Sequence, residues 1–173
     1  MTEIQAAIAS EQLKKLNALT EPRIELANYL TERISRVDGI TPPVVLPECK
    51  HVYYVYPMKF DEEKMGISRS NFVKAVNAEG VLHWEGYCVP LYMLPMYQKR
   101  IVFGRKGCPF DCGYYDGNVS YERGICPITE KMYEKELFFN DFCRPPLTKK
   151  DLDDVVNAFY KVLENKDKLK DIS

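Results

Sequence analysis

The sequence predicts an α+β domain in which a small antiparallel sheet is covered by helices. Strand-like segments are short, and helical patterns separate them from one another. Helical patterns also occupy both ends of the chain, so that the order is helix, helix, strand, helix, strand, loop, helix, strand, helix. Hydrophobic residues make up 46% of the 173 positions and charged residues 28%, which is enough apolar side chain to build a real core.

The first predicted helix begins at once and is apolar on more than one side. Thr2 and Gln5 have the spacing of a capping box. At about 100° per residue, apolar residues cover about half of the helix circumference; they are Ile4, Ile8, Ala9, Leu13, Leu16 and Leu19. A surface this wide needs neighbours on more than one side. It fits either the core helix of a small domain or a helix that another domain or chain covers.

A second helical pattern spans residues 23–37. Its apolar residues recur at near-helical spacing, and Gly39 is a natural stop. Pro22 lies just before this pattern and lacks the N–H that a helix interior needs, so we expect a kink there. We therefore predict a long helical region over 1–38, kinked near Pro22, and an α+β domain over 39–173.

The next segments predict a connector, two strands and a helix. The Pro-rich stretch 40–48 is an expected extended connector. Residues 51–60 are dense in β-branched and aromatic side chains, which predicts a strand. Ser68 is placed to cap a helix that Gly80 ends. The second predicted strand follows at 81–88.

Regular periodicity fades between Val89 and Gly124, where Pro, Gly and aromatic residues dominate. A long irregular stretch in a compact domain is typical of a binding or active-site loop. Its tyrosines combine an apolar face with a hydroxyl that can orient a polar ligand. Ordinary core and loop packing explains the same composition, so both interpretations stay open.

The last segments predict a helix, a strand and a helix. Pro127 suits the first turn of a helix over 127–136, and the apolar run 136–142 predicts a short strand. Thr148 and Asp151 can cap the final helix. Its apolar stripe consists of Leu152, Val155, Val156, Phe159 and Leu163.

Charge and hydropathy exclude several function classes. Lys and Arg total 24 against 25 for Asp and Glu, so no net field attracts nucleic acid or anionic lipid. No apolar run approaches the roughly 18 residues of a membrane span, and the start lacks the pattern of a signal peptide. We therefore expect no nucleic-acid partner, no membrane association and a cytoplasmic location. In that compartment the six cysteines are expected to be thiols.

Candidate metal and nucleotide sites are weak. Structural zinc sites use closely spaced ligand pairs, and only Cys108 and Cys112 form such a pair, whereas Cys126 and Cys143 stand alone. We predict no metal site and expect buried thiols that pack as small hydrophobes; a zinc-stabilised binding domain remains as a third hypothesis. Neither GxGxxG after a strand nor GxxxxGK[ST] occurs.

The two histidines do not form a metal pair. His51 and His83 each lie in or beside a predicted apolar strand, without a neighbouring ligand in the sequence. We expect packed or edge positions for both of them. Catalysis by a cysteine and a histidine needs a geometry that separate residues do not establish.

Seven stretches of the sequence carry a resemblance by their order and spacing. The first two are "QAAIASEQLKKL" and "RIELANYL", and they are followed by "HVYYVYPMKF", "GISRSNFVKAVNAEGV", "GYCVPLYMLPMYQ", "CPITEK" and "LTKKDLDDVVNAFYKV". Together they resemble the C-terminal part of the DegT/DnrJ/EryC1/StrS family, whose members are pyridoxal-phosphate-dependent aminotransferases of keto sugars and cyclitols; the first two are similar to its interdomain helix and the other five to its small domain. The stretch "GYCVPLYMLPMYQ" and the stretch "CPITEK" are most similar to the branch of the family that includes scyllo-inosamine and related cyclitol or aminosugar transaminases.

The resemblance implies a C-terminal fragment of such an aminotransferase. The region 1–38 would be the interdomain helix, and 39–173 the small domain of a fold-type I enzyme, with the large cofactor-binding domain absent. The family's Schiff-base lysine would then lie upstream of Met1, so we predict no catalytic and no cofactor-binding residue. Pyridoxal phosphate is expected in the full-length parent and not on this chain alone.

The resemblance also implies substrate contacts and a partner. Tyr92 occupies a position in "PLY" that is often histidine in relatives, and it keeps a hydrogen-bonding tip without titrating near neutrality. Tyr87, in the same loop, is the second predicted substrate-binding residue. The parent's substrate would be a keto sugar or cyclitol, and a homodimer is expected. The alternative is a stand-alone interaction or regulatory module that kept the fold and lost the enzyme.

Overall fold

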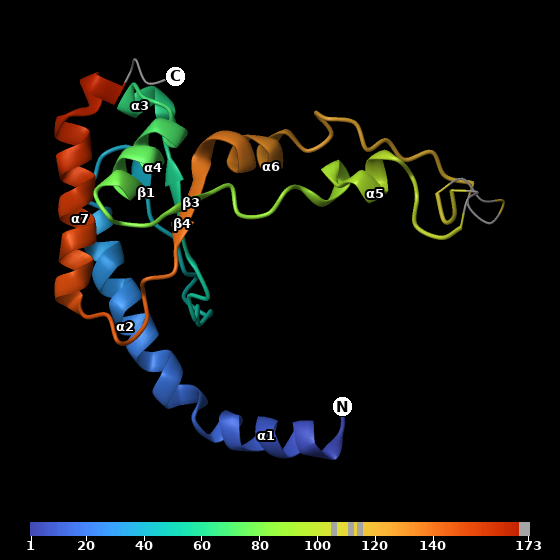
Figure 1. Cartoon of the computed structure of the whole chain (residues 1–173), viewed down its shortest axis with the longest axis horizontal. Helices are drawn as coiled ribbons and strands as arrows, with labels where there is room; N and C mark the ends of the chain where they lie inside the picture. Colours follow the sequence, from blue (N-terminus) through green and yellow to red (C-terminus); the bar gives the residue numbers. More distant parts are fainter. Residues whose placement is uncertain (105–106, 111–112, 114–115, 170–173) are drawn as a thin grey trace.

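The computed structural model describes residues 1–104, 107–110, 113 and 116–169. Within them, four strands form one antiparallel sheet in the order β1-β2-β4-β3. The strands are β1 (Ile40–Thr41), β2 (Tyr56–Phe60), β3 (Trp84–Glu85) and β4 (Leu137–Asn140). Long helices cover one face of this sheet (Figure 1), which confirms the predicted α+β class.

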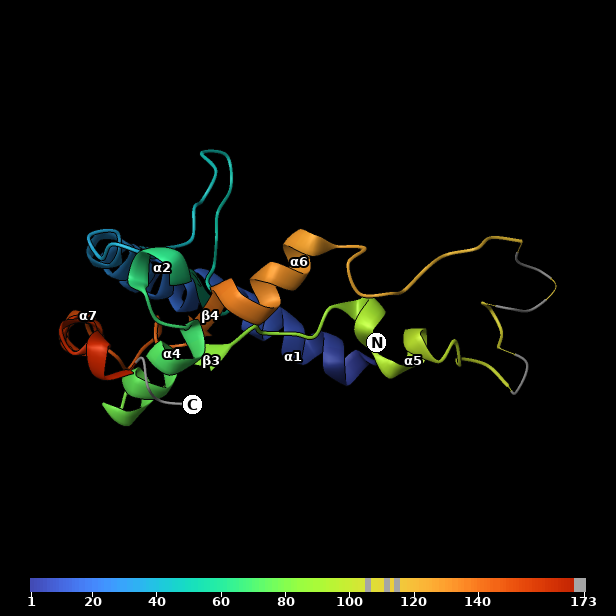
Figure 2. The same ribbon diagram turned by 90° about the horizontal axis from the view of Figure 1, so that it is seen from above.

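Helices open and close the chain. The long ones are α1 (Glu3–Lys14), α2 (Leu16–Ile34), α4 (Arg69–Ala78) and α7 (Lys149–Glu164). Short helices are α3 (Glu62–Met65), α5 (Pro95–Gln98) and α6 (Pro127–Lys131), with 3-10 turns η1 (Leu91–Met93) and η3 (Lys166–Leu169) and a π-helical turn η2 (Met132–Glu136). Helices α2 and α7 pack side by side behind the sheet, and α4 contacts α7 (Figure 2).

The core lies between the sheet and helices α2, α4 and α7. Because side chains alternate along a strand, β2 and β4 each turn one set of residues inward, and Phe138 of β4 is fully buried. Phe72 of α4 lies edge-on to Phe138 and to Phe159 of α7, with ring centroids 5.8 Å and 5.1 Å away. The predicted apolar stripe of the last helix is thus what joins it to the sheet.

The predicted helix caps are confirmed. Thr2 and Gln5 form the reciprocal capping box of α1. The Ser68 hydroxyl accepts a hydrogen bond from the Asn71 N–H at the start of α4. At α7, the Asp151 carboxylate accepts from the N–H and the hydroxyl of Thr148. These local signals depend on a few neighbouring atoms, which is why the sequence alone identifies them.

The predicted strand over 51–60 is wrong in its first half, because β2 begins at Tyr56. Tyr53 has a left-handed φ of 50°, and its N–H donates to His51 Nδ1 at 2.9 Å. Both features turn the chain away from extended geometry. The expected connector 40–48 is also partly wrong, since Ile40 begins the short strand β1, in which it pairs with Phe60.

Three further elements differ in detail from the prediction. The strand expected over 81–88 is limited to Trp84–Glu85. The helix expected over 127–136 divides into α6 and the π-helical turn η2. The irregular stretch 89–124 contains η1 and α5, and Pro95 stands at the first turn of α5, where a missing N–H is harmless.

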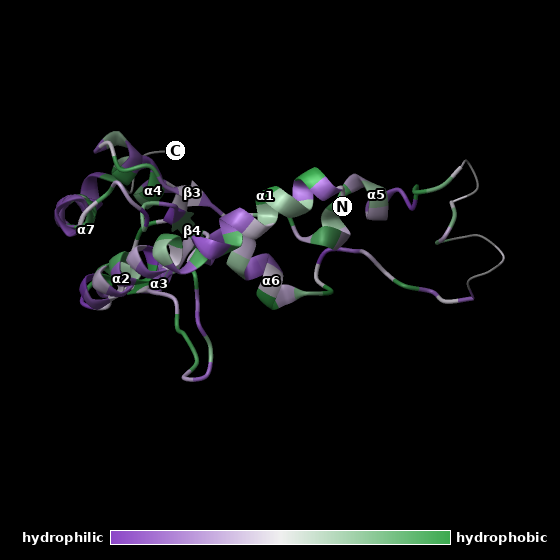
Figure 3. Cartoon of the chain, turned by 90° about the horizontal axis from the view of Figure 1, so that it is seen from below, coloured by the Kyte–Doolittle hydropathy of each residue, from purple (hydrophilic) through white to green (hydrophobic). Residues whose placement is uncertain are grey.

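Helix α1 projects from the domain with no buried residue. The chain changes direction at Lys15, between α1 and α2, whereas Pro22 lies inside α2. Ile4 and Ile8 are 75% and 58% exposed, and apolar residues follow one another along α1 in Figure 3. The apolar surface predicted for the first helix therefore has no cover within the described part of the chain.

A second projection, which we call the arm, comprises the described residues within 88–125. It leaves the sheet after β3, carries η1 and α5, and returns to α6. The arm and α1 extend from the domain toward the same side, so the molecule has the outline of a C (Figure 1). Among the described residues, none of the helices is both long and apolar enough to cross a membrane.

Candidate functional site

The face of the sheet that the long helices leave open carries an aromatic cluster. Trp84 of β3 is paired with Phe139 of β4, so the two side chains lie on the same face of the sheet. Their rings stack with centroids 5.5 Å apart and an interplanar angle of 26°. The ring of Tyr87 meets Phe139 edge-on at 5.1 Å. Phe139 is thereby flanked by two more exposed aromatic rings.

A sharp turn after β3 places Tyr87 in this cluster. Gly86 and Tyr87 have left-handed φ values of 70° and 68°. The Gly86 N–H donates to the Leu137 carbonyl at 2.8 Å, which fixes the turn against β4. A Cβ on Gly86 would lie 2.7 Å from the carbonyl oxygen of Tyr133. Glycine is therefore required here for both φ and space.

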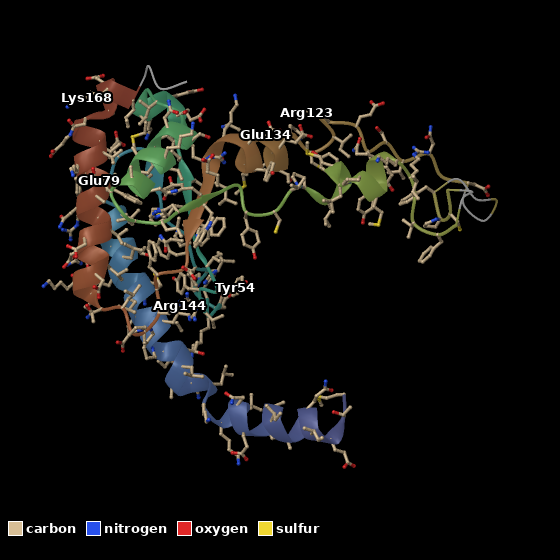
Figure 4. All side chains as sticks on the ribbon, in the orientation of Figure 1. Tyr54, Glu79, Arg123, Glu134, Arg144 and Lys168 are labelled. Carbon is tan, nitrogen blue, oxygen red and sulfur yellow. The ribbon has the colours of Figure 1, made fainter. Side chains whose placement is uncertain are left out.

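The aromatic cluster forms one wall of a pocket of about 350 Å³, which we call the aromatic–arginine pocket. It is lined by Arg23, Tyr54, Val55, Trp84, Tyr87, Phe139, Asp141 and Arg144. Tyr54 and Arg144 lie close to each other on the open side of the domain, above the start of α2 (Figure 4). Aromatic walls with a few charged groups are typical of small-molecule sites.

Two guanidinium groups and one carboxylate supply the charge in this pocket. Arg144 Nη2 lies 2.6 Å from Asp141 Oδ2. Arg23 Nη1 donates to the Tyr53 carbonyl at 3.0 Å. Because a guanidinium carries five N–H donors, each arginine keeps further donors beyond the bond described here. The pocket therefore combines flat apolar faces with donors for an anionic or hydroxyl-rich ligand.

Tyr92 lies elsewhere, at the base of the arm. It is buried in η1, and its hydroxyl donates to Glu130 Oε1 on α6. The Gly124 N–H donates to the same carboxylate oxygen at 2.7 Å. Burial and the hydrogen bond to Glu130 raise the pKa of Tyr92 to about 12. The same hydrogen bond, together with the Gly124 N–H, lowers the pKa of Glu130.

The two predicted substrate-binding tyrosines are thus in different environments. Tyr87 lines the aromatic–arginine pocket, and Tyr92 connects the arm to α6. Four further lining residues were not predicted from the sequence and come from four separate segments: Arg23, Trp84, Phe139 and Arg144. The sequence contains only one weak signal for this pocket. Phe138 and Phe139 are neighbours in a predicted strand, which indicates that both faces of that strand are apolar.

His83 is packed in the core, as expected for one of the histidines, whereas His51 is exposed and lies before β2. His83 is buried against Phe138, Phe142 and Phe159. Its ring nitrogens lie 3.0 Å from the Val81 carbonyl oxygen and 3.0 Å from Asn140 Nδ2, so the neutral ring donates to the carbonyl and accepts from the amide. Burial lowers the pKa of His83 to about 4.

The described residues include some, but not all, of the cysteines that the zinc hypothesis involves. Cys143 is buried, and burial raises its pKa to about 12, as for a thiol that packs as a hydrophobe. Cys112 of the "CPFDC" pair lies outside the described residues, as do Tyr114 and Tyr115 of the tyrosine-rich loop. Within the described ranges, no three His, Cys, Asp or Glu side chains are grouped for a metal ion.

The described residues do not fit a cradle for pyridoxal phosphate. That cofactor needs a lysine for its Schiff base and donors for its phosphate, and a lysine that reacts at neutral pH is desolvated. Each described lysine is exposed, except Lys166, which is half-buried at the end of the chain. We therefore derive no chemical step through this cofactor on these residues.

Comparisons with known proteins identify similar sequences. The family model described as DegT/DnrJ/EryC1/StrS aminotransferase matches residues 1–109. The chain is 25% identical over 167 residues to the spore coat polysaccharide biosynthesis protein SpsC of Bacillus subtilis, covering 96% of this chain and 38% of SpsC. It is 26% identical over 170 residues to L-glutamine:scyllo-inosose aminotransferase of Streptomyces griseus, covering 95% of this chain and 38% of that protein.

Solved structures share the fold. DesV of S. venezuelae superposes with a TM-score of 0.68 at 20% identity, covering 95% of this chain and 37% of DesV. The aminotransferase PseC of Helicobacter pylori gives a TM-score of 0.64 at 19% identity, covering 95% of this chain and 38% of PseC. The chain thus spans less than two fifths of the length of these relatives.

Proposed function

We propose, from the premise that this chain belongs to the DegT/DnrJ/EryC1/StrS aminotransferase family, that it supplies the small domain of an enzyme that aminates a keto sugar or a cyclitol. The aromatic–arginine pocket is the observation that carries this proposal. It opens on the side of the sheet free of long helices, toward which α1 and the arm extend. A pocket in that place can form one wall of a larger site completed by another domain.

The residues of the pocket support a role in holding a polyhydroxylated ring. Sugar and cyclitol rings present C–H groups on one face, which pack on flat aromatic side chains such as Trp84. The Tyr87 hydroxyl and the two guanidinium groups can bond to ring hydroxyls. Phe139 lies between Trp84 and Tyr87 and fixes the orientation of both rings. These groups bind and orient the substrate, and the proposal assigns no proton transfer to them.

Tyr92 stays a predicted substrate contact within this proposal. Its hydroxyl hydrogen is used by Glu130, so a substrate could only donate to the remaining lone pairs of the hydroxyl oxygen. Because its pKa is raised to about 12, the hydroxyl stays protonated at neutral pH. Tyr92 would therefore orient a ligand without exchanging a proton with it.

The chain alone is proposed to be catalytically silent, since the lysines within the described residues lack the desolvated environment of a Schiff base. We expect that the purified chain mixed with pyridoxal phosphate, reduced with borohydride and digested, gives only scattered labelling of exposed lysines. A stoichiometric adduct on a single lysine, seen by mass spectrometry, would contradict this part of the proposal.

The positive test combines this chain with a cofactor-binding domain. We expect the coding sequence that adjoins Met1 to encode a lysine-bearing domain, and coexpression of the two parts to give transamination of a keto sugar or inosose. Tyr87→Ala should then lower kcat/KM, and Tyr160→Ala, an exposed tyrosine on α7 away from the pocket, serves as the control. Lack of a cofactor domain in the adjoining sequence would favour the alternative, a stand-alone interaction or regulatory module.

A further inference from the structure

A groove between helices α4 and α7 lies outside the site of the proposed function. It has a volume of about 460 Å³, and its lining residues come from α4, α7 and the turn η3. We call it the α4–α7 groove. Glu79, one of its lining residues, lies beside α7 in Figure 4, away from Tyr54 and Arg144 of the aromatic–arginine pocket.

We infer that the α4–α7 groove binds a small carboxylate with an aliphatic tail. The carboxylate lies on the ammonium group of Lys74, and the tail lies along the floor between the two helices. The inference adds a second ligand site to the chain. It goes beyond the proposed function and does not depend on the aromatic–arginine pocket.

The floor of the groove is aliphatic. Ala75 and Ala78 lie on one stripe of α4, because residues three apart share a helix face. Val162 of α7 and Leu169 of η3 line the opposite side. Each alanine side chain ends at Cβ and leaves open the space that a longer side chain would fill. None of the described residues that line the groove is aromatic, so an aliphatic chain matches the floor better than a flat ring.

Two polar contacts between elements bound the groove. Lys161 Nζ of α7 lies 2.5 Å from Glu79 Oε2 at the end of α4. Asn71 Nδ2 of α4 donates to the Leu169 carbonyl of η3 at 2.9 Å. Asn71 and Glu79 are eight positions apart, which is about 12 Å along a helix. The groove is therefore bounded at small-molecule length, and its volume lies within the range of about 300–1,000 Å³ that is typical of ligand sites.

The charge at the rim selects the head group of the ligand. Lys161 and Glu79 neutralise each other. Lys74 is exposed and forms no ion pair with any described residue, so one positive charge remains among the lining groups. An ammonium group is a compact point charge with three donors. It matches a singly charged carboxylate, whereas an uncharged head group would leave it without a partner.

A neighbouring pocket of about 260 Å³, which we call the acidic pocket, provides a contrast. It lies at the other end of α7, where Val81, Leu152 and Val155 supply apolar atoms. Its charged lining groups are the carboxylates of Asp151 and Asp154. Because like charges in contact are costly, a carboxylate ligand is disfavoured there, although its aliphatic tail would fit. Charge is therefore the property that directs the ligand to the α4–α7 groove.

Methyl resonances in NMR spectra locate the ligand. The full chain is titrated separately with decanoate, decanol, decyltrimethylammonium and acetate, below the concentrations at which micelles form. We expect saturable shifts of the Ala78, Val162 and Leu169 methyl groups with decanoate, about tenfold weaker binding of decanol, and no saturable shifts of these groups with decyltrimethylammonium or acetate. The Val81 and Leu152 methyl groups of the acidic pocket should not shift with decanoate.

Two variants test the head group and the floor separately. Lys74→Gln should weaken binding of decanoate by about tenfold, to the affinity of decanol, because it removes a charge-assisted contact. Lys150→Gln is the matched control, since it removes an exposed lysine at the other end of α7. Ala78→Leu fills the floor and should weaken binding of decanoate and decanol alike. Lys74 and Ala78 are exposed, so the fold should be retained, which circular dichroism verifies.

Four results would overturn the inference. They are absence of methyl shifts in the α4–α7 groove with decanoate, binding of decanol as tight as that of decanoate, an affinity for decanoate that Lys74→Gln leaves unchanged, and shifts centred on the acidic pocket. None of these results bears on the proposed function, which is tested separately by transamination in the presence of a cofactor-binding domain.

Discussion

His83 shows how a single buried side chain can make stability depend on pH. Its ring is buried among three phenylalanines and is held neutral by the Val81 carbonyl and the Asn140 amide. Protonation would place a charge in the core and direct an N–H toward the donor group of Asn140. The lowered pKa of about 4 expresses that penalty.

We predict that the free energy of unfolding falls by about 3 kcal/mol between pH 6.5 and pH 4 because of His83. In this interval the unfolded chain takes up a proton on His83 and the folded chain does not, since the folded pKa is lowered from 6.5 to about 4. Stability is therefore present above pH 6.5 and is lost as the pH falls. Urea unfolding at several pH values measures the change.

Two histidine variants separate the contribution of His83 to the pH dependence of stability from the contribution of the carboxylates. His83→Gln should remove the His83 share of the pH dependence, and His51→Gln, at the exposed histidine, should leave it in place. Equal pH dependence in wild type and His83→Gln would contradict the prediction.

Another single residue, Tyr53, explains why the strand predicted over 51–60 begins only at Tyr56. The aromatic and β-branched run 51–60 is typical of a strand, yet a left-handed φ at Tyr53 and the bond from its N–H to His51 end the extended geometry. Composition does not encode this conformation, because non-glycine residues rarely adopt it. Capping residues such as Ser68 and Thr148 were predictable because each acts on atoms three positions away.

At the scale of elements, the turn at Gly86 is the sharpest constraint beside the pocket. We predict that Gly86→Ala destabilises the fold by about 3 kcal/mol, of which strain at positive φ gives about 1 kcal/mol and overpacking the rest. The added Cβ would lie 2.7 Å from the Tyr133 carbonyl oxygen. Thermal and urea unfolding measure the loss.

Gly80 provides the matched control for that prediction. Its φ is +88°, and a Cβ there would meet nothing within 4 Å. Gly80→Ala should therefore show only the conformational penalty of about 1 kcal/mol. Equal losses for the two variants would mean that the contact between Gly86 and Tyr133 adds nothing.

The elements also show what sequence patterns leave out. Helices α2, α4 and α7 were predictable because each buries one face in the core, so that its apolar residues recur at helical spacing in the sequence. The pocket was not, because Arg23, Trp84 and Arg144 are far apart in the chain and meet only once β3 pairs with β4. The π-helical turn after α6 has no comparable sequence signal.

At the scale of the whole molecule, the uncovered α1 predicts association. We expect the chain to self-associate through α1, and the double variant Ile4→Glu, Ile8→Glu to shift it to monomers in sedimentation velocity, because exposed apolar patches mark interfaces. The free energy of unfolding measured at low concentration should change by no more than about 0.5 kcal/mol, since α1 buries no residue in its own domain.

The control variant adds a charge to α1 and leaves its apolar residues unchanged. Gln12→Glu adds a charge to α1 at an exposed polar position and should leave association unchanged. A wild-type chain that sediments as a monomer at every concentration would contradict the expected role of α1.

The carboxylate of Glu130 joins the outgoing and returning legs of the arm, through Tyr92 and Gly124. The stretch between those two legs is therefore a loop closed at its root. For such a loop, each doubling of length adds only about 0.6 kcal/mol of closure entropy. Insertions and deletions beyond the two anchor points should thus be nearly neutral for the sheet and its pocket, which leaves the tip of the arm free to diversify while the root stays fixed.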